Sequence, residues 1–241
     1  MNIFKSPLTP PPHLAEKDRI ALAKLGRLHA VPKHEYVFRP GHTARQVYLI
    51  VSGQIKVSRA SLAGRDVPLF FHSTAEIIGI QDALLGDGQW SRQCFSQACE
   101  DSVVSVIALE AFKSFLAMRF RAAQYVMEAL CFRLNETSEN LASLAAANVG
   151  PRVARIILHM SACYGRYVGA QAVELGMPLT QQELADIVGA ARQTVNGVIQ
   201  ALKAQGIITI TRQYMRVEDE AQLRQIAAND VPYSQVSNSL R

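Results

Sequence analysis

Two short runs between Leu179 and Ile208 place apolar side chains at intervals of three and four residues. That spacing buries one face of a helix and leaves the opposite face polar. It predicts a first helix from about Gln181 and a second helix from Arg192. The apolar positions that define the two buried faces are Leu184, Ile187, Val188, Val195, Ile199 and Leu202.

Residues at the ends of these runs predict where the helices begin and end. Thr180 can cap the first helix with its hydroxyl, and Glu183, three residues later, completes a capping box. Gly189 stands where a left-handed C-cap would end that helix. The turn is therefore expected at residues 189–191, which gives the layout of a helix-turn-helix DNA reader.

The second helix presents polar side chains on its outward N-terminal side. Arg192 can donate a bidentate pair to guanine, and Gln193 can pair with adenine, each contact worth about 1–3 kcal/mol against a wrong base. A helix-turn-helix used only for protein contact is the alternative interpretation. The candidate DNA-binding residues are Thr180, Gln181, Arg192, Gln193, Thr194, Asn196, Gly197, Lys203, Arg212 and Arg216.

Two β-branched runs, residues 207–211 and 214–217, follow this pair and predict a hairpin that could serve as a wing. The chain has no carboxylate between Asp186 and Glu218, although four basic side chains lie in that interval. We therefore expect this face to present unopposed positive charge to a phosphate backbone. The basic residues are Arg192, Lys203, Arg212 and Arg216.

The N-terminal half has a different pattern, in which the short runs YVFRPG, QVYLIVSG, QIKVSR and DVPLFF alternate with glycines at positions 41, 53 and 64. This spacing predicts a small antiparallel barrel or double-sheet roll. Residues 111–147 then contain neither proline nor glycine, which predicts an extended helix with one break near residues 118–120.

That extended helix carries apolar residues at alternating spacings of three and four, which is a heptad seam. A seam on a helix that leaves a barrel buries little within its own chain. We therefore expect the same helix of a second subunit to cover it in a parallel coiled coil, the alternative being an ordinary core helix. The predicted dimer-interface residues are Met127, Leu130, Leu134, Thr137, Leu141 and Leu144.

Composition is compatible with a folded protein of two domains, because the 241 residues are 49% hydrophobic and 19% charged. The net charge of +5 suits an anionic partner such as double-stranded DNA. No apolar run approaches the roughly 20 residues that a membrane span needs. The proline-rich start also lacks the apolar core of a signal peptide, so we expect a cytoplasmic protein with no membrane partner.

The segment LTQQELADIVGAARQTVNGVIQALKAQGII resembles the helix-turn-helix of the Crp/Fnr family of bacterial transcription regulators, and FRPGHTARQVYLIVSGQIKV resembles the opening strands of that family's cyclic-nucleotide-binding domain. The resemblance covers about residues 25–217. It implies a homodimeric regulator with RNA polymerase as a partner. It leaves activation or repression open, and an activator is the expectation. Two recognition helices about 34 Å apart would read a palindromic site.

Some positions of the reading helix match the family and others depart from it. Arg192, Thr194 and Val195 occupy the family's places, whereas Gln193 stands where many members have glutamate and Gly197 where the cyclic-AMP receptor protein has an arginine. A glutamine here would lose the contact that a glutamate makes to cytosine, and it would gain a donor–acceptor pair that suits adenine. The resemblance also places a hinge at residues 148–151. The DNA-reading helices would rotate about this hinge when the barrel changes conformation.

The effector site of the family would lie in the segment AEIIGIQDALLGDGQWSRQCF. A hand alignment places Arg92 at the arginine that neutralises a cyclic phosphate, but Ile80 replaces the ribose-binding glutamate after Gly79. Because isoleucine cannot accept a hydrogen bond, a buried ribose hydroxyl would lose about 1–3 kcal/mol, so cyclic AMP should bind poorly. Thr137 and Ser138 match residues that contact adenine. The candidate effector residues are Gly79, Arg92, Gln93, Thr137 and Ser138.

Cysteines and histidines give no metal or disulfide pattern. Cys94, Cys99, Cys131 and Cys163 have no CxxC spacing or zinc-type partner, and none precedes the barrel as in an Fnr-type iron–sulfur cluster. We expect small buried hydrophobic thiols, with a Cys94–Cys99 redox pair as the alternative. A haem or metal role for the histidines at positions 29, 34, 42 and 72 is a further alternative; we expect no metal and no required cofactor.

These observations predict an α+β chain in which an N-terminal antiparallel, cupin-like β-roll is followed by a long dimerisation helix and a C-terminal winged helix-turn-helix. The expected parts are an arm and helix at 1–24, the roll at 25–110, the dimerisation helix at 111–147, the DNA-binding domain at 148–228 and a tail at 229–241. The predicted function is sequence-specific transcription regulation, not catalysis, with the effector left open. Alternatives are a cyclic-nucleotide-responsive regulator, a cupin-like metal enzyme with a docking winged helix, and a nucleotide-sensing subunit without DNA binding.

Overall fold

A computed structural model describes residues 12–61, 64, 66–85, 89–144, 148–168, 172–176, 179–211 and 214–228. The chain divides into two compact units, an N-terminal unit of residues 12–134 and a C-terminal unit that begins at Asn135. The boundary lies inside one helix, α4 (Phe120–Leu144), rather than at the helix ends that the sequence analysis used. The predicted arm at 1–11 and the tail at 229–241 lie outside the described residues.

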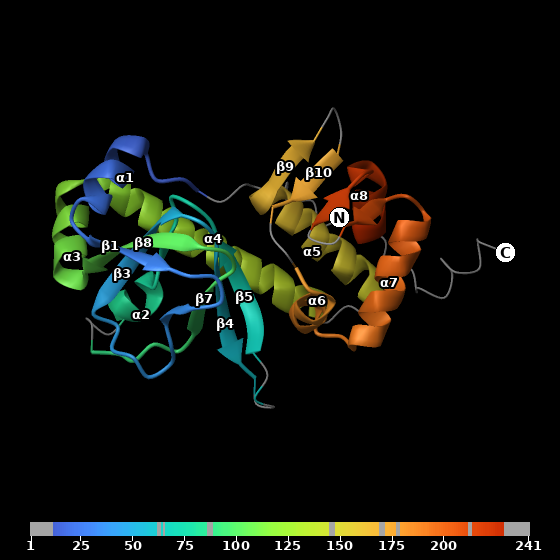
Figure 1. The fold of residues 1–241 in the computed structure, drawn as a ribbon, viewed down its shortest axis with the longest axis horizontal. Coiled ribbons are helices and arrows are strands. Elements are labelled where there is room, and N and C mark those ends of the chain that lie inside the picture. The colour runs from blue at the N-terminus through green and yellow to red at the C-terminus, as the bar shows by residue number, and fades with distance from the viewer. Residues whose placement is uncertain are drawn as a thin grey trace. The chain divides into compact units, whose positions relative to one another are not determined.

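Two four-stranded antiparallel sheets form the centre of the N-terminal unit (Figure 1), with strand orders β1-β8-β3-β6 and β2-β7-β4-β5. The predicted runs at 36–41, 46–53, 54–59 and 66–71 therefore fold as strands, as expected. The strands are β1 (Arg27–Val31), β2 (Tyr36–Phe38), β3 (Gln46–Ser52), β4 (Ile55–Ala60), β5 (Asp66–His72), β6 (Ile77–Ile78), β7 (Phe95–Ala98) and β8 (Ser102–Ala108).

Alternate residues of β3 serve two different cores, because successive side chains of a strand point to opposite faces. Tyr48 and Ile50 join a cluster with residues of both sheets, which shows that the sheets pack face to face. Val47 and Leu49 join a second cluster that includes side chains of the helices. The helices on that face are α1 (Glu16–Ala23), α2 (Ile80–Leu85), α3 (Leu109–Met118) and the first turns of α4.

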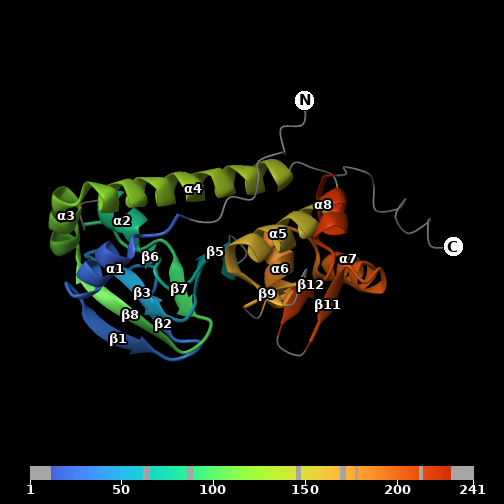
Figure 2. The ribbon, with the colours of Figure 1, turned by 90° about the horizontal axis from the view of Figure 1, so that it is seen from above.

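The predicted break in the long helix is confirmed at Arg119, whose φ of −134° separates α3 from α4. Arg119 reaches back to the nearly buried Asp18 of α1, with 2.7 Å between Nη1 and Oδ1. This contact fixes the corner at which α4 begins. From there α4 runs without interruption over 25 residues (Figure 2).

The C-terminal unit is built around α5 (Val149–Tyr164), which packs against three later helices. These helices are α6 (Gln181–Val188), α7 (Arg192–Ala204) and α8 (Glu220–Ala228). A four-stranded sheet in the order β11-β12-β10-β9 completes the unit. The predicted wing is confirmed as β11 (Ile208–Ile210) and β12 (Met215–Val217), but the hairpin of β9 (Gly165–Val168) and β10 (Ala172–Leu175) was not predicted.

Candidate nucleic-acid interface and barrel interior

The N-terminus of α6 is fixed by the predicted capping box. The Thr180 hydroxyl accepts a hydrogen bond from the Glu183 backbone N–H at 3.1 Å, and the Glu183 carboxylate accepts one from the Thr180 N–H at 3.0 Å. At the other end, Gly189 has a φ of +67°, the left-handed conformation that glycine adopts without strain. These local signals confirm the first helix and the turn.

The turn also packs closely against the end of α4. A β-carbon at position 189 would lie 2.7 Å from the Leu144 side chain. Leu144 was predicted to face a second subunit, and it remains 47% exposed beside this contact. Gly189 is therefore required both for its backbone conformation and for the approach of Leu144.

The reading helix α7 buries one face and exposes the start of the other. Val195, Ile199 and Leu202 are buried as predicted, and Arg192, Gln193 and Thr194 are exposed in the first turn, which holds no acidic residue. Lys203 is exposed in the last turn. The structure therefore leaves the predicted base-reading side chains accessible on one short stretch of helix.

Asn196 is held by a hydrogen-bond arrangement that sequence reasoning did not find. Its Oδ1 accepts from Gln181 Nε2 at 3.1 Å and from Gln200 Nε2 at 3.4 Å. Gln181, the first residue of α6, is thus tied to α7, so these two predicted DNA-binding residues interact with each other. Gly197 beside them is half-buried.

The expectation of unopposed positive charge on the wing is wrong for Arg216. Its Nη2 lies 3.2 Å from Glu174 Oε2, and the two residues are direct partners in the register of β12 and β10. The carboxylate comes from before the interval that the sequence analysis examined, on a strand that it had not predicted. Arg212, which lies between β11 and β12 in the sequence, is outside the described residues.

In the barrel, the effector candidates Arg92 and Gly79 lie in contact, and the arginine is turned inward. Its side chain is only 1% exposed, Nη1 donates to the Gly79 carbonyl at 2.6 Å, and Nη2 donates to the carbonyl of Gln46. The guanidinium stacks over the Phe38 ring, 4.5 Å from its centroid.

The surroundings of Arg92 hold it in this inward position. Burial lowers the pKa of Arg92, while the charges of Tyr48 and Asp82 oppose that shift. Burial likewise raises the pKa of the Tyr48 hydroxyl, against the opposing effect of Arg92. Both Nη atoms of the guanidinium are therefore held in a cage of its own chain, whereas the buried Nε has no hydrogen-bond partner in the described part of the chain.

The remaining effector candidates do not join this cage. Gln93, the next residue, is exposed and donates to the Ser91 carbonyl at 3.0 Å. Ile80, where a ribose-binding carboxylate was missing, is fully buried in the helix-facing core. Thr137 and Ser138 are exposed on the part of α4 that belongs to the C-terminal unit.

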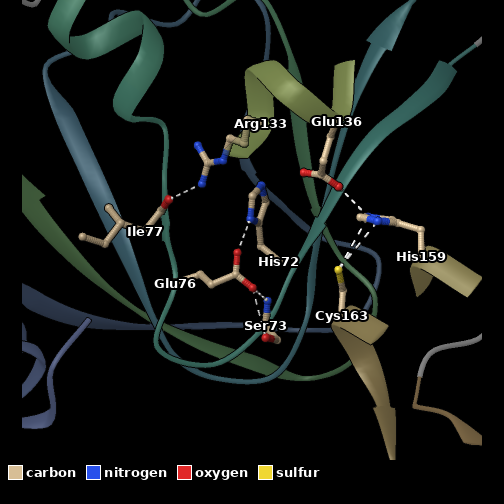
Figure 3. A network of polar contacts seen from close by, with 8 residues as sticks. All are labelled: His72, Ser73, Glu76, Ile77, Arg133, Glu136, His159 and Cys163. Carbon is tan, nitrogen blue, oxygen red and sulfur yellow. Dashed lines mark hydrogen bonds and ion pairs between the residues drawn. The ribbon is translucent and has the colours of Figure 1, made fainter. Parts of the chain in front are cut away.

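A second buried polar group lies in the barrel, around Glu76 (Figure 3). Its Oε2 is 2.8 Å from His72 Nδ1, and its Oε1 accepts from the N–H and the hydroxyl of Ser73. Burial alone would raise the pKa of Glu76, but the interactions with His72, Ser73 and Arg133 outweigh it and lower the pKa. Arg133 of α4 also donates to the Ile77 carbonyl at 2.9 Å.

In this arrangement His72 is paired with the carboxylate of Glu76. Among the described residues, no group of three His, Cys, Asp or Glu side chains is placed to hold a metal ion. Cys94 and Cys99 form no disulfide and lie just beyond the two ends of the extended strand β7. Because a strand advances about 3.3 Å per residue, they are too far apart for a disulfide, and the proposed redox pair is wrong.

The cysteines also differ from the expectation of uniform burial. Cys131 is exposed, and Cys94, Cys99 and Cys163 are only partly buried. Burial raises the pKa of the Cys94 thiol. Cys163, which was expected to be a buried thiol, lies beside His159 in the C-terminal unit, and that histidine pairs with Glu136.

The seam of α4 is largely exposed in the single chain. Met127 is 53% exposed, and Leu134 and Leu141 are each 69% exposed, at intervals of seven residues. Phe120, seven residues before Met127, extends this line and was not predicted. Leu130, by contrast, packs partly against the core of its own unit. We call the exposed residues Phe120, Met127, Leu134 and Leu141 the α4 stripe.

Comparison with known proteins agrees with this architecture. Residues 28–119 match the cyclic nucleotide-binding domain, and residues 151–226 match the Crp-like helix-turn-helix domain. Among the residues described, no helix is long and apolar enough to cross a membrane.

Curated relatives and solved structures extend the likeness over most of the chain. A CRP-like cAMP-activated global transcriptional regulator of Mycobacterium tuberculosis is 28% identical over 194 residues, 80% of this chain and 84% of that protein. The fumarate and nitrate reduction regulatory protein of Vibrio cholerae is 23% identical over 83% of this chain and 78% of its own length. The structure of FixK2 from Bradyrhizobium japonicum has a TM-score of 0.70 at 18% identity, over 85% of this chain and 98% of that one. The chain thus belongs to the Crp/Fnr family of DNA-binding transcription regulators.

Proposed function

We propose that this regulator acts as a homodimer on a palindromic DNA site, that α7 reads the bases, and that its effector is not cyclic AMP. The observation that carries the proposal is the exposed triplet Arg192, Gln193 and Thr194 above a buried apolar face. A helix placed in this way can enter the major groove with its N-terminal side chains toward base edges. RNA polymerase as a partner, with activation as the outcome, and a cytoplasmic location belong to the same proposal.

Dimerisation is supported by the α4 stripe. Four large apolar side chains at heptad spacing face away from the core of the single chain, although burying them would remove a large apolar area from water. The same helix of a second copy offers a complementary surface, because a two-fold axis places each side chain against its own equivalent. The resulting pair would present two reading helices to successive turns of DNA.

The state of Arg92 argues against cyclic AMP. A phosphate could bind Nη1 and Nη2 only after their bonds to the Gly79 and Gln46 carbonyls break. Ile80 supplies no acceptor for a ribose hydroxyl and is part of the core. A cyclic-nucleotide-responsive regulator remains the second candidate because the barrel belongs to that domain family.

Binding to a library of randomised palindromes, followed by fluorescence anisotropy on the selected site, tests the proposal. Arg192→Ala should relax base preference at one position, with a loss of about 1–3 kcal/mol on the best site and little change on poor sites. Arg212→Ala should weaken all sequences and reduce the salt slope by about one. Arg27→Ala, which removes the same charge from an exposed position on β1, is the matched control. Equal losses on all sequences for Arg192→Ala would contradict its base-reading role.

Cyclic AMP is tested separately by thermal shift. A ligand that binds only the folded state raises the melting temperature by mass action, so cyclic AMP at a concentration that stabilises the mycobacterial relative should leave this protein unchanged. A stabilisation that Arg92→Met abolishes would favour the second candidate.

A further inference from the structure

Three side chains of the C-terminal unit form a cluster that the proposed reading of DNA does not use (Figure 3). His159 and Cys163 lie one turn apart on α5, with 3.6 Å between Sγ and Nε2 and 3.9 Å between Sγ and Nδ1. Glu136, on α4, forms an ion pair with the same Nε2. The imidazole therefore lies between a carboxylate and a thiol.

This position keeps the imidazole charged. Burial on its own would lower the pKa of His159, but the hydrogen bonds and charges of Cys163 and Glu136 outweigh it and raise the pKa to about 10. At neutral pH the ring is therefore a cation, and it holds a proton within reach of the sulfur. A charged ring at this distance can also give its proton to the group that leaves when the sulfur is oxidised.

The cluster is also accessible to small molecules. The His159 side chain is 27% exposed and the Glu136 side chain is 16% exposed, and Cys163 is only partly buried. Cys131, on α4 between Met127 and Leu134 of the α4 stripe, is more exposed than Cys163 in the single chain. Exposure therefore favours Cys131 in a single chain, but pairing of the stripe would cover it. The decisive comparison is the Cys163 rate with and without the His159 cation.

We propose that Cys163 is a modification site that small peroxides oxidise to a sulfenic acid, and that His159 assists as the proton donor. The thiol proton leaves to solvent and the sulfur attacks one peroxide oxygen. The O–O bond breaks, sulfur loses two electrons, and the peroxide is reduced. The departing hydroxide takes the imidazolium proton and becomes water, and the ring regains a proton from solvent. Dithiols can return the sulfenic acid to the thiol.

Oxidation should disturb the link between α4 and α5. Only 3.6 Å separates Sγ from the Nε2 of the ring, so an oxygen added to the sulfur would crowd the ring. The same Nε2 makes the ion pair with Glu136. Because α5 packs against α6, α7 and α8, a shift at this contact would alter the frame that carries the reading helix. This consequence rests on the proposed function, whereas the reactivity of Cys163 does not.

A peptide-level labelling experiment tests the site in the full chain. Purified protein is treated with limiting hydrogen peroxide and a dimedone probe, and adducts at Cys163 and Cys131 are followed by mass spectrometry. We expect Cys163 to react about tenfold faster than Cys131, a ratio that falls to about one in denaturant. His159→Gln should lower the Cys163 rate about tenfold and leave the Cys131 rate unchanged.

Two results would overturn the site: a Cys163 rate no higher than that of Cys131 in the native chain, or a ratio unchanged by His159→Gln in a variant with a native circular dichroism spectrum. Should His159→Gln fail to fold, Glu136→Gln serves instead, because losing the carboxylate favours the neutral ring and should also slow Cys163.

The regulatory consequence is measured on the selected DNA site. Peroxide should reduce the affinity of the wild-type protein at least fivefold, dithiothreitol should restore it, and Cys163→Ser should be insensitive while Cys131→Ser behaves as wild type. If Cys163 is oxidised selectively but the affinity for DNA does not change, the proposed effect on DNA binding is wrong, while Cys163 stands as the oxidation site. An untreated protein that binds no DNA would overturn the proposed function, and the labelling ratio would still decide the site.

Discussion

The guanidinium of Arg92 lies so close to Gly79 that a β-carbon at position 79 would approach Nη1 to 2.7 Å. Gly79 also has a φ of +75°, and its carbonyl accepts a hydrogen bond from the same Nη1. The glycine therefore shapes the cage that keeps the arginine inside the barrel. Two residues that the family resemblance assigned to a ligand thus contact each other.

Gly79→Ala should accordingly destabilise the protein by about 3 kcal/mol, from backbone strain and from the clash with Arg92. The control is Gly41→Ala, where φ is +86° and nothing lies within 4 Å, so that only the strain of about 1 kcal/mol remains. Urea unfolding measures both changes. In an Arg92→Met background the cost of Gly79→Ala should fall to that of Gly41→Ala. Equal costs for the two glycines in the wild-type background would contradict the close packing of Arg92.

The buried carboxylate of Glu76 predicts a dependence of stability on pH. Because its pKa is lowered in the folded state, its contribution is present above the unfolded value of about 4.3 and is lost as pH falls through the folded value. Glu76→Gln should cost about 3 kcal/mol at pH 7, since it breaks the pair with His72, and should flatten the acid limb of the stability curve.

Urea unfolding between pH 3 and pH 7 would reveal both effects of Glu76→Gln. Glu110→Gln is the matched control, because Glu110 is exposed and pairs with Lys113 only at the surface. It should change the unfolding free energy by less than about 1 kcal/mol. If Glu76→Gln kept the acid slope of the wild type, Glu76 would not be ionised in the folded protein.

His159 predicts a titration in the opposite direction. Its folded pKa of about 10 lies above the unfolded value of about 6.5, so its contribution is complete below pH 6.5 and is lost as pH rises through 10. The ring proton resonances in an NMR titration should therefore move near pH 10. Glu136→Gln should lower the midpoint, whereas Glu139→Gln, an exposed carboxylate that accepts from Asn135, should leave it unchanged. A midpoint near 6.5 in the wild-type protein would refute the ion pair.

The sequence predicted the parts of this molecule that depend on neighbours along the chain. Thr180 and Glu183 are three residues apart and define a cap by themselves, and Gly189 marks a left-handed turn wherever it occurs. Arg216 and Glu174 are 42 residues apart and meet only because β12 pairs with β10. No residue near Arg216 in the sequence predicts its pairing with Glu174.

The same reason explains the errors at the candidate sites. The resemblance assigned Arg92 to a phosphate-binding position, but the direction of its side chain depends on the carbonyls of Gly79 and Gln46, which come from other segments. Glu136 and His159 lie on different helices, so their ion pair has no local signature, although His159 and Cys163 are one turn apart on α5. Helices, caps and the α4 stripe could therefore be predicted, whereas polar contacts between distant segments could not.

The α4 stripe predicts an interface that a single charge should destroy. Leu134 is 69% exposed at the middle of the stripe, and a carboxylate there would be buried opposite its own equivalent in a parallel pair. Leu134→Asp should raise the dimer dissociation constant at least a hundredfold in sedimentation equilibrium. Because two reading helices must bind together, it should also weaken palindromic DNA far more than a half-site. Leu28→Asp, at a position 61% exposed on β1, is the control and should leave both unchanged. A wild-type protein that sediments as a monomer at micromolar concentration would disprove the interface.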